Sequence, residues 1–470
     1  MPAKVTLGLS GDQHAHLRNF LFPPDGKEAI AILLCGQRDG DRRYRLSVRE
    51  IHEIPYEYCT KRTTQMVTWS PDYVDDILER AATEKLSVVK IHSHPNGYAK
   101  FSETDDESDD RILPMIRGWV EADLPHGSVV MLPGGQMFGR VLRDGAVEQI
   151  ECISVAGDEL HFWYADAEGY EAPSFVASHA QAFDEGTIER LQRLSIGVVG
   201  ASGTGSPTIE QLVRLGAGEV VMVDDDTTED RNINRILNST IQDAKEGRAK
   251  VDVIADSVMR MGLGTKVVSI NKNLWDPDVV RAIAQCDVLF GCVDSIDGRY
   301  LLNAISTFYN IPYFDLGIRL IADPKGENRG RVREVCGTVN YIRPGRSSLM
   351  SRGLFTMQGV AAAGLARNDP TAHQRQVKDG YIKGVQGSRP AVISVNMLGS
   401  ALAVNEFLAR LHPYREDANC THAAVTFSLA SMELISDSEE GICSILSSWV
   451  GAGDMKPLLR EMGLAERRKA

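Results

Sequence analysis

The 470-residue sequence predicts an α/β protein with at least two domains. A chain of this length exceeds the usual size of one domain. Its first 155 residues combine short apolar runs with amphipathic segments, which indicates mixed strands and helices. From about residue 186, apolar strands alternate with helical segments. That alternation predicts right-handed βαβ units around a parallel, doubly wound sheet.

Composition and charge narrow the class of protein. Sixty-four acidic against fifty-one basic residues give a formal net charge of −13, which disfavours nucleic-acid binding. The sequence shows neither a secretory signal nor an apolar run of about eighteen residues, so we expect a cytoplasmic protein without a membrane partner. The eight scattered cysteines include no C-x-x-C pair, which indicates reduced thiols in place of a disulfide framework.

The first domain is expected to span residues 1–155, followed by a connector at 156–180. Apolar runs bounded by turn residues predict buried strands, and helical spacing of apolar residues predicts one helix. The expected elements are strands at 28–36 and 86–91, a helix at 72–84 and a hairpin beginning at 127–133.

The second domain is expected at 181–412, with residues 413–470 as its C-terminal extension. Its expected elements are strands at 194–200, 219–224, 287–294 and 311–315, a helix after Thr208 and an apolar helix at 391–408. The polar segment 366–383 contains Pro370 and is expected to be a long loop.

The first domain carries a set of residues suited to zinc chemistry. His92 and His94 end a strand one residue apart, so their side chains point to the same side. Together with Asp105, eleven positions beyond His94, they form a three-ligand set that leaves a zinc position open for water. Such a metal lowers the pKa of the water, and Glu28 is the best candidate for the general base. The Ser102 hydroxyl is a candidate to stabilise the oxyanion.

These five residues, in this order and spacing, resemble the JAB/JAMM (MPN+) zinc metalloprotease family. The resemblance implies an α/β metalloprotease-like domain that binds Zn²⁺. It also implies hydrolysis of peptide or isopeptide bonds after the C-terminus of a ubiquitin-like protein. An inactive docking domain is the alternative, and the complete ligand set argues against it.

A glycine-rich turn opens the second domain. Gly200, Gly203 and Gly205 follow a strand and precede a helix, where backbone N–H groups approach phosphates. Asp224, at the end of the next strand, is placed to hold ribose hydroxyls. These residues alone equally allow an NAD-dependent dehydrogenase.

The residues after Asp224 favour nucleotidyl transfer. Arg235 and Lys250, with Asn232, would surround a triphosphate, and Asp294 would hold Mg²⁺. A hydride transfer does not need this set of charges. The candidate nucleotide-binding residues are therefore Gly200, Gly203, Gly205, Asp224, Asp226, Asn232, Arg235, Lys250 and Asp294, with Arg235 also catalytic.

This half resembles the ubiquitin-activating (ThiF/MoeB/HesA) superfamily. The resemblance implies a Rossmann-like domain that uses ATP and Mg²⁺ to adenylate a C-terminal glycine, and it favours a homodimer. The paired C-x-x-C zinc knuckles of many sulfur-carrier activators are missing, and Ile236 stands where the family usually has Gln.

Some members of this superfamily pass the acyl group to a cysteine. Cys443 follows a polar loop and is expected to begin a helical turn, where a thiol has a lowered pKa. Cys420 and Cys336 are weaker candidates, and the absence of any thioester remains open.

The two halves together predict one function. The first domain would trim a precursor or remove conjugates, and the second would adenylate the exposed glycine of a ubiquitin-like partner, with a conjugating enzyme downstream. The combination resembles bacterial ubiquitin-like conjugation operons associated with antiviral defence. Sulfur-carrier processing for thiocarboxylate synthesis, a non-catalytic scaffold that binds such tails, and an NAD-linked oxidoreductase are the alternatives.

Overall fold

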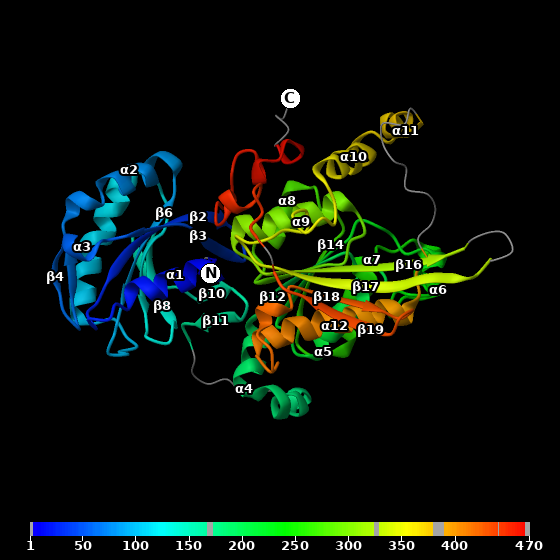
Figure 1. Cartoon of the computed structure of the whole chain (residues 1–470), viewed down its shortest axis with the longest axis horizontal. Helices are drawn as coiled ribbons and strands as arrows, with labels where there is room; N and C mark the ends of the chain where they lie inside the picture. The colour runs from blue at the N-terminus through cyan, green and yellow to red at the C-terminus, as the bar shows by residue number, and fades with distance from the viewer. Residues whose placement is uncertain (1–2, 167–172, 324–328, 379–389, 440, 466–470) are drawn as a thin grey trace. The chain divides into compact units, whose positions relative to one another are not determined.

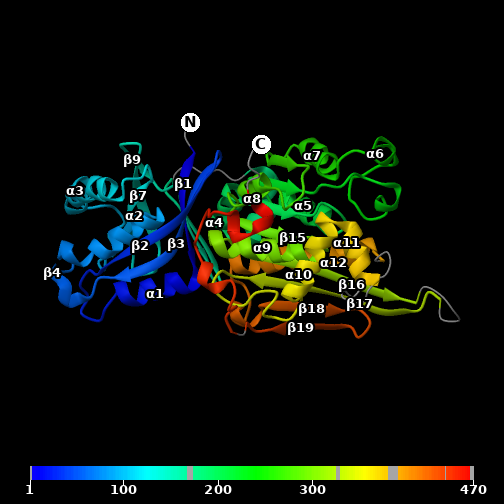
Figure 2. The same cartoon turned by 90° about the horizontal axis from the view of Figure 1, so that it is seen from above.

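The computed structural model divides the chain into two units, each with its own sheet (Figures 1 and 2). It describes residues 3–166, 173–323, 329–378, 390–439 and 441–465. The first unit comprises Met1–Tyr170, Thr307–Asn310 and Ser448–Glu461, and the second comprises Glu171–Ser306, Ile311–Ser447 and Met462–Ala470. Within the described residues, no helix is long and apolar enough to cross a membrane.

The segment Ser448–Glu461 belongs to the first compact unit, whereas the expected domain bounds place all of 413–470 with the second domain. Inside the first unit, the Gly36 amide donates a hydrogen bond to the Gly451 carbonyl at 3.2 Å, and Arg38 pairs with Asp454 at 2.9 Å. These contacts are long-range in sequence, so local patterns do not reveal them.

The first unit is a nine-stranded sheet with helices on its faces. The strand order is β11-β10-β1-β3-β2-β6-β7-β8-β9. Its strands are β1 (Lys4–Ser10), β2 (Ile30–Asp39), β3 (Arg43–Glu53), β6 (Ser87–Ser93), β7 (His126–Met131), β8 (Met137–Arg143), β9 (Ala146–Gln149), β10 (Cys152–Ala156) and β11 (Leu160–Tyr164), with β4 (Cys59–Arg62) and β5 (Val67–Trp69) forming a separate hairpin. Its helices are α1 (Gly11–Leu21), α2 (Asp75–Glu84) and α3 (Glu103–Val120).

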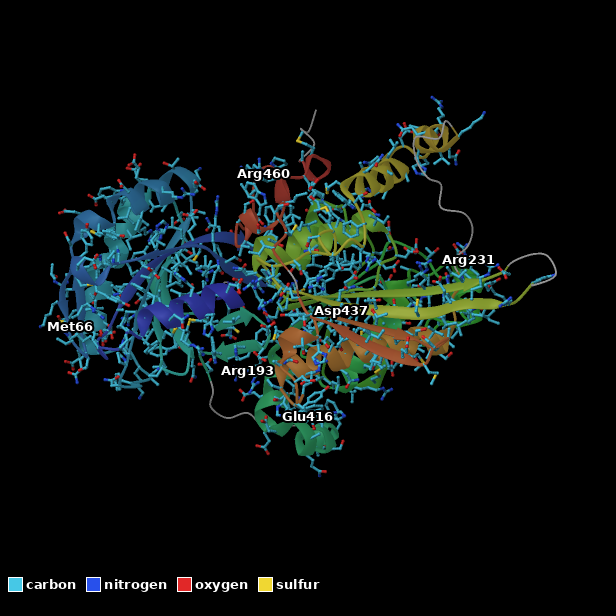
Figure 3. All side chains as sticks on the ribbon, in the orientation of Figure 1. Met66, Arg193, Arg231, Glu416, Asp437 and Arg460 are labelled. Atoms are coloured by element: carbon cyan, nitrogen blue, oxygen red, sulfur yellow. The ribbon has the colours of Figure 1, made fainter. Side chains whose placement is uncertain are left out.

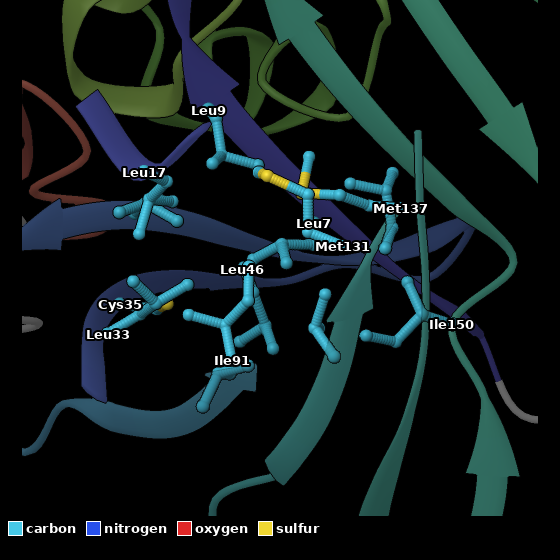
Figure 4. Close-up of a cluster of buried hydrophobic side chains, with 14 of the residues drawn as sticks. Leu7, Leu9, Leu17, Leu33, Cys35, Leu46, Ile91, Met131, Met137 and Ile150 are labelled. Atoms are coloured by element: carbon cyan, nitrogen blue, oxygen red, sulfur yellow. The ribbon is translucent and has the colours of Figure 1, made fainter. Parts of the chain in front are cut away.

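Strand β2 is apolar on both sides because both faces of the sheet are covered. Leu33 and Cys35 belong to a core that includes residues of α1 (Figure 4). Ile32 and Leu34 belong to a second core that includes residues of α2 and α3. Alternate residues of a strand face opposite sides, so a continuous apolar run is what two cores require. The predicted strands at 28–36 and 86–91, the helix at 72–84 and the hairpin near 127–133 are confirmed as β2, β6, α2 and β7–β8.

A buried histidine makes the stability of the first unit pH-dependent. His126 on β7 is fully buried, and its Nδ1 accepts a hydrogen bond from the Val88 amide at 3.0 Å. Burial, assisted by the charge of Arg117, lowers the pKa of His126 from 6.5 to about 4. The unfolded chain therefore binds this proton at a higher pH than the folded chain does, and stability falls as the pH drops through the interval between these two values.

We expect the first unit to lose about 2 kcal/mol between pH 7 and pH 5 through His126 alone. In His126→Asn the amide oxygen can still accept the hydrogen bond from Val88 without gaining a proton. This variant should lose correspondingly less stability over the same range in calorimetric unfolding. If the wild type and the variant lost equal free energy of unfolding between pH 7 and pH 5, His126 would not be the source of the pH dependence.

The second unit is an eight-stranded sheet whose first five strands are parallel. The order is β14-β13-β12-β15-β16-β17-β18-β19, and the strands from β16 to β19 pair antiparallel. The strands are β12 (Ser195–Val199), β13 (Glu219–Val223), β14 (Lys266–Ile270), β15 (Val288–Gly291), β16 (Tyr313–Ala322), β17 (Val332–Ile342), β18 (Ala424–Ser428) and β19 (Glu433–Asp437). The helices are α4 (Ala177–Arg193), α5 (Gly205–Arg214), α6 (Ile241–Glu246), α7 (Lys250–Met261), α8 (Pro277–Ile283), α9 (Ile296–Tyr309), α10 (Met357–Asn368), α11 (Pro370–Lys378) and α12 (Ile393–Leu411).

The predicted parallel sheet is confirmed for β12 to β16, and the apolar helix expected at 391–408 is α12. The loop expected at 366–383 is wrong where the segment is described, because α10 ends at Asn368 and α11 begins at Pro370; residues 379–383 lie outside the described residues. Pro370 occupies the first turn of α11, where its missing N–H costs nothing. The Asp369 carboxylate accepts a hydrogen bond from the Ala372 amide at 2.9 Å, so Asp-Pro here starts a helix.

Candidate metal and nucleotide sites

Three ligand-type side chains meet at one edge of the first sheet. His92 lies in β6, opposite Ile30 of the antiparallel strand β2, and His94 follows directly after the strand. Asp105 lies in the first turn of α3. The end of β6 and the start of β2 share this edge, which also places Glu28 there.

The distances within this cluster fit one tetrahedral zinc ion. His92 Nε2 lies 3.0 Å from Asp105 Oδ1, His94 Nε2 lies 3.3 Å from Asp105 Oδ2, and the two Nε2 atoms are 3.1 Å apart. Zinc bonds of ~2.0–2.1 Å at tetrahedral angles separate neighbouring ligand atoms by about 3.3 Å. The donor set therefore fits zinc in both type and spacing.

The ring of His94 is oriented for metal binding. Its Nδ1 donates a hydrogen bond to the Tyr98 carbonyl at 2.7 Å, which leaves the lone pair on Nε2 for a metal. A turn brings Tyr98 into this position: the Gly97 amide donates to the His94 carbonyl at 2.9 Å, and Gly97 has a φ of 76°.

Ser102 and Asp105 together form the N-terminal cap of α3. The Ser102 hydroxyl lies 2.7 Å from Asp105 Oδ2, and the Ser102 amide donates to the same oxygen at 2.8 Å. Burial alone would raise the pKa of Asp105, but the hydrogen bonds from His92 and His94 outweigh it and hold this pKa well below its usual range. The spacing of this pair, predicted from its chemistry alone, is also that of a capping box.

Glu28 is buried beside the cluster. Only 4% of the residue is exposed, and burial raises the pKa of its carboxyl group to about 7, with Asp105 raising it further and His94 lowering it. The backbone of Glu28 is fixed from both sides: its amide donates to the Thr63 carbonyl at 2.8 Å, and Arg62 Nε donates to its carbonyl at 2.9 Å. Both partners belong to the β4–β5 hairpin, whose turn contains Met66, labelled in Figure 3.

The glycine-rich turn of the second unit lies where the strand order reverses. β12 has β13 on one side and β15 on the other, so the loops after β12 and β15 open at the switch point of the sheet. Gly200 has a φ of 92°, and a Cβ atom there would lie 2.5 Å from the Cys292 carbonyl oxygen. At Gly205 a Cβ atom would lie 1.7 Å from the Gly200 carbonyl oxygen. Only glycine fits these two positions.

Asp224 supports this turn directly. Its carboxylate accepts hydrogen bonds from the Ala201 amide at 2.7 Å and from the Asp226 amide at 2.9 Å. Burial raises the pKa of Asp224, while the positive charge of Lys250 lowers it. Lys250 is itself buried, with its Nζ 2.5 Å from Asp226 Oδ2 and 3.8 Å from Asp224 Oδ1.

A cavity of 1640 Å³ brings most of the predicted nucleotide residues together. Its lining includes Gly200, Gly203, Asp224, Asp226, Asn232, Arg235, Lys250 and Asp294. Gly205 begins α5 and is not among the lining residues. Arg231, labelled in Figure 3, also lines the cavity, and its carbonyl accepts a hydrogen bond from Arg235 at 2.6 Å.

The cavity lining also includes a group of residues around Arg367 of α10 that the sequence did not predict. Arg367 lies with its Cζ 4.0 Å from the ring centroid of Trp275 and forms an ion pair with Asp297. All three residues line the cavity. Trp275 follows β14 and Asp297 lies in the first turn of α9, so no local pattern connects them with Arg367.

Cys443, the first candidate for an acyl-accepting thiol, is a buried residue. Its carbonyl accepts a hydrogen bond from the Ser447 amide at 3.0 Å, so a helical turn starts there as expected. The residue is 1% exposed and is not among the residues that line the cavity. Its amide donates to the Arg346 carbonyl at 3.1 Å. Cys292 does line the cavity, but burial raises the pKa of its thiol to about 12. Cys336 is half-buried and Cys420 is exposed.

Comparison with protein families gives these sites a context. The model of the ThiF family matches residues 176–438, more than half of the chain. The chain belongs to the ThiF family. The model of the prokaryotic homologs of the JAB domain matches residues 13–141. The chain therefore combines an N-terminal JAB domain with a C-terminal, Rossmann-like ThiF domain, which confirms the expected fold class and both family resemblances.

Several curated proteins are similar to part of this chain. Ubiquitin-like modifier-activating enzyme 5 of Drosophila willistoni is 24% identical over 255 residues, which cover 49% of this chain and 59% of that protein. SAMP-activating enzyme E1 of Haloferax volcanii is 33% identical over 123 residues, covering 26% of this chain and 45% of that protein. The chain thus covers less than two thirds of the length of each.

Among solved structures, the crystal structure of E. coli MccB with MccA-N7isoASN is similar to 56% of this chain and 69% of that one, with a TM-score of 0.43 and 16% identity.

Proposed function

We propose that the ThiF domain adenylates the C-terminal carboxylate of a ubiquitin-like or sulfur-carrier protein. The observation that supports this proposal most strongly is the 1640 Å³ cavity at the switch point, whose lining includes the glycine turn, Arg235, Lys250 and Asp294. The relatives whose names mention ubiquitin-like modifiers and SAMP proteins suggest the class of substrate.

In this reaction a carboxylate oxygen attacks the α-phosphorus of ATP, and pyrophosphate leaves. The amides of the glycine turn and the start of α5 face the phosphates. Lys250 and Arg235 stabilise the negative charge that shifts onto the leaving pyrophosphate. Asp294 would hold Mg²⁺, which neutralises phosphate charge when bound.

We further propose that the JAB domain hydrolyses peptide or isopeptide bonds after the same kind of tail. His92, His94 and Asp105 would hold Zn²⁺, which supplies Lewis-acid chemistry when bound. Glu28 takes a proton from the attacking water and returns it to the leaving amine, a role that a pKa near neutrality favours. Ser102 would turn its hydroxyl from Asp105 toward the developing oxyanion.

Pyrophosphate exchange into ATP tests the adenylation directly. With a carrier protein that ends in glycine, we expect the chain to exchange labelled pyrophosphate into ATP, and to lose this activity when the carrier is absent or its final glycine is removed. ATP that binds without carrier-dependent exchange would contradict the proposal and would favour a scaffold that binds tails without turnover.

Sulfur-carrier processing is the second candidate, and the cysteines favour it. Among the described residues, Cys292 is the only thiol that lines the cavity, and burial suppresses its ionisation. An acyl adenylate without an adjacent thiolate suits release to a sulfur donor. A thioester that survives gel electrophoresis without reductant would instead support conjugation, with a conjugating enzyme as partner.

The proposal also includes a homodimer. Sedimentation of the full chain would measure this oligomeric state.

A further inference from the structure

A buried ion cluster lies next to the proposed zinc ligands. Lys90 and Asp109 are 3% and 4% exposed at their side chains, with 2.6 Å between Lys90 Nζ and Asp109 Oδ1. Arg140 approaches the other carboxylate oxygen of Asp109, with its Nε 2.8 Å away. Asp109 therefore joins α3 to two strands, β6 and β8, at once.

Strand pairing places Lys90 and Arg140 at the same level of the sheet, in one row that runs across neighbouring strands. Lys90 pairs with Ser128 of β7, and Ser128 pairs with Arg140 of β8. Because Ser128 is small, the two long side chains can both reach Asp109 across it. The next row on the same face begins with His92, two residues beyond Lys90.

The helix repeats this spacing. Asp105 and Asp109 are four residues apart on α3, so they lie on one face about 6 Å apart along the axis. Lys90 and His92 are about 6.6 Å apart along β6. Residues on two successive turns of α3 therefore contact residues in two successive rows of the sheet. Asp109 contacts Lys90, and Asp105 contacts His92.

Such a cluster is a costly way to join a helix to a sheet. Replacing a buried ion pair with apolar side chains of similar volume is often neutral or stabilising, whereas removing one partner leaves an uncompensated charge. Stability alone therefore does not account for the cluster. The ion pairs of the cluster are directional, so they restrict the sliding and rotation of α3 on β6 more strictly than apolar contacts do.

We infer that Asp109, with Lys90 and Arg140, is a positioning residue for the zinc site and holds Asp105 at ligand distance from His92 and His94. The inference rests on the proposed zinc site of the JAB domain. Asp109 does not touch the metal; it acts by fixing the helix that carries the third ligand.

The zinc dissociation constant, measured by competition with a chelator on the full chain, tests this role. Groups that orient metal ligands usually contribute 10–100-fold to metal affinity, so we expect Asp109→Asn to raise the zinc Kd by about that factor. The same variant should change the visible absorption bands of bound Co²⁺, which report the geometry of the ligands.

Leu113→Ala is the matched control, because Leu113 lies one turn beyond Asp109 on α3 and is buried without taking part in the ion cluster. It should lower the melting temperature of the zinc-free protein and leave the zinc Kd and the Co²⁺ spectrum as in the wild type. If Asp109→Asn does not fold, Arg140→Gln provides the test, since it retains the Lys90–Asp109 contact and should raise the Kd by a smaller factor.

The inference would be overturned if Asp109→Asn and Arg140→Gln fold and bind zinc with the wild-type Kd. It would also be overturned if Leu113→Ala raised the zinc Kd by as much as Asp109→Asn does. If the wild-type chain itself binds no zinc, the proposed zinc site fails, and the inference fails with it.

Discussion

Substituting Arg235 with alanine is expected to lower carrier-dependent pyrophosphate exchange by at least about 10³-fold, the scale of a cationic side chain that stabilises transition-state charge in phosphoryl transfer. Asp294→Ala should lower it by a similar factor, because it removes the proposed Mg²⁺ ligand. Both side chains line the cavity, beside the glycine turn. Arg235 supplies a positive charge near the phosphates, and Asp294 follows β15, on the other side of the switch point. The two variants should remain folded, because neither side chain is buried.

A matched control separates this effect from a general loss of charge. Arg214 forms an ion pair with Glu210 on the surface of α5, away from the cavity lining, and Arg214→Ala should exchange pyrophosphate like the wild type. Full exchange in Arg235→Ala and Asp294→Ala would show that the cavity is not the adenylation site.

Glu28→Gln should lower hydrolysis by about 10²–10⁴-fold, the usual contribution of a general base, while zinc content stays at the wild-type level. Glutamine has the shape of glutamate, but it cannot take a proton from water. The substrate for this measurement is a carrier protein extended beyond its glycine, and mass spectrometry detects the trimmed product. Glu103→Gln, an exposed acidic residue beside the Ser102 cap, is the control and should remain active.

The pH dependence of the hydrolysis rate is a second test of Glu28 as the general base. The base works only when Glu28 is deprotonated, so the wild-type rate should rise with pH. Its pKa is about 7 without metal, and a nearby zinc charge lowers it, which places the rising limb below pH 7. An active Glu28→Gln protein with an unchanged pH profile would exclude this residue as the base.

The sequence predicts the parts of both sites that lie close together along the chain. His92 and His94 follow from strand periodicity, and Asp105 follows from a short spacing beyond them. The glycine turn is equally local, since the positive φ of Gly200 and the tight packing of Gly205 allow no other residue.

The remaining parts depend on contacts between distant segments. Nothing local connects Lys90 with Arg140, because only the register through Ser128 brings them to the same carboxylate. The helix α11 replaces the expected loop because Pro370 stands in a helical first turn, where its missing N–H is not needed. The burial of Cys443 likewise depends on the tertiary fold, and no local pattern shows it.

One measurement addresses the central claim that both domains act on the same tail. A ubiquitin-like carrier with additional residues after its glycine is incubated with the full chain, zinc and ATP, and its intact mass is followed. We expect a trimmed carrier that then gains the mass of AMP, whereas Glu28→Gln should leave the precursor unchanged but still adenylate a carrier that already ends in glycine. A precursor that is never trimmed, together with a mature carrier that never gains AMP, would refute the proposed function.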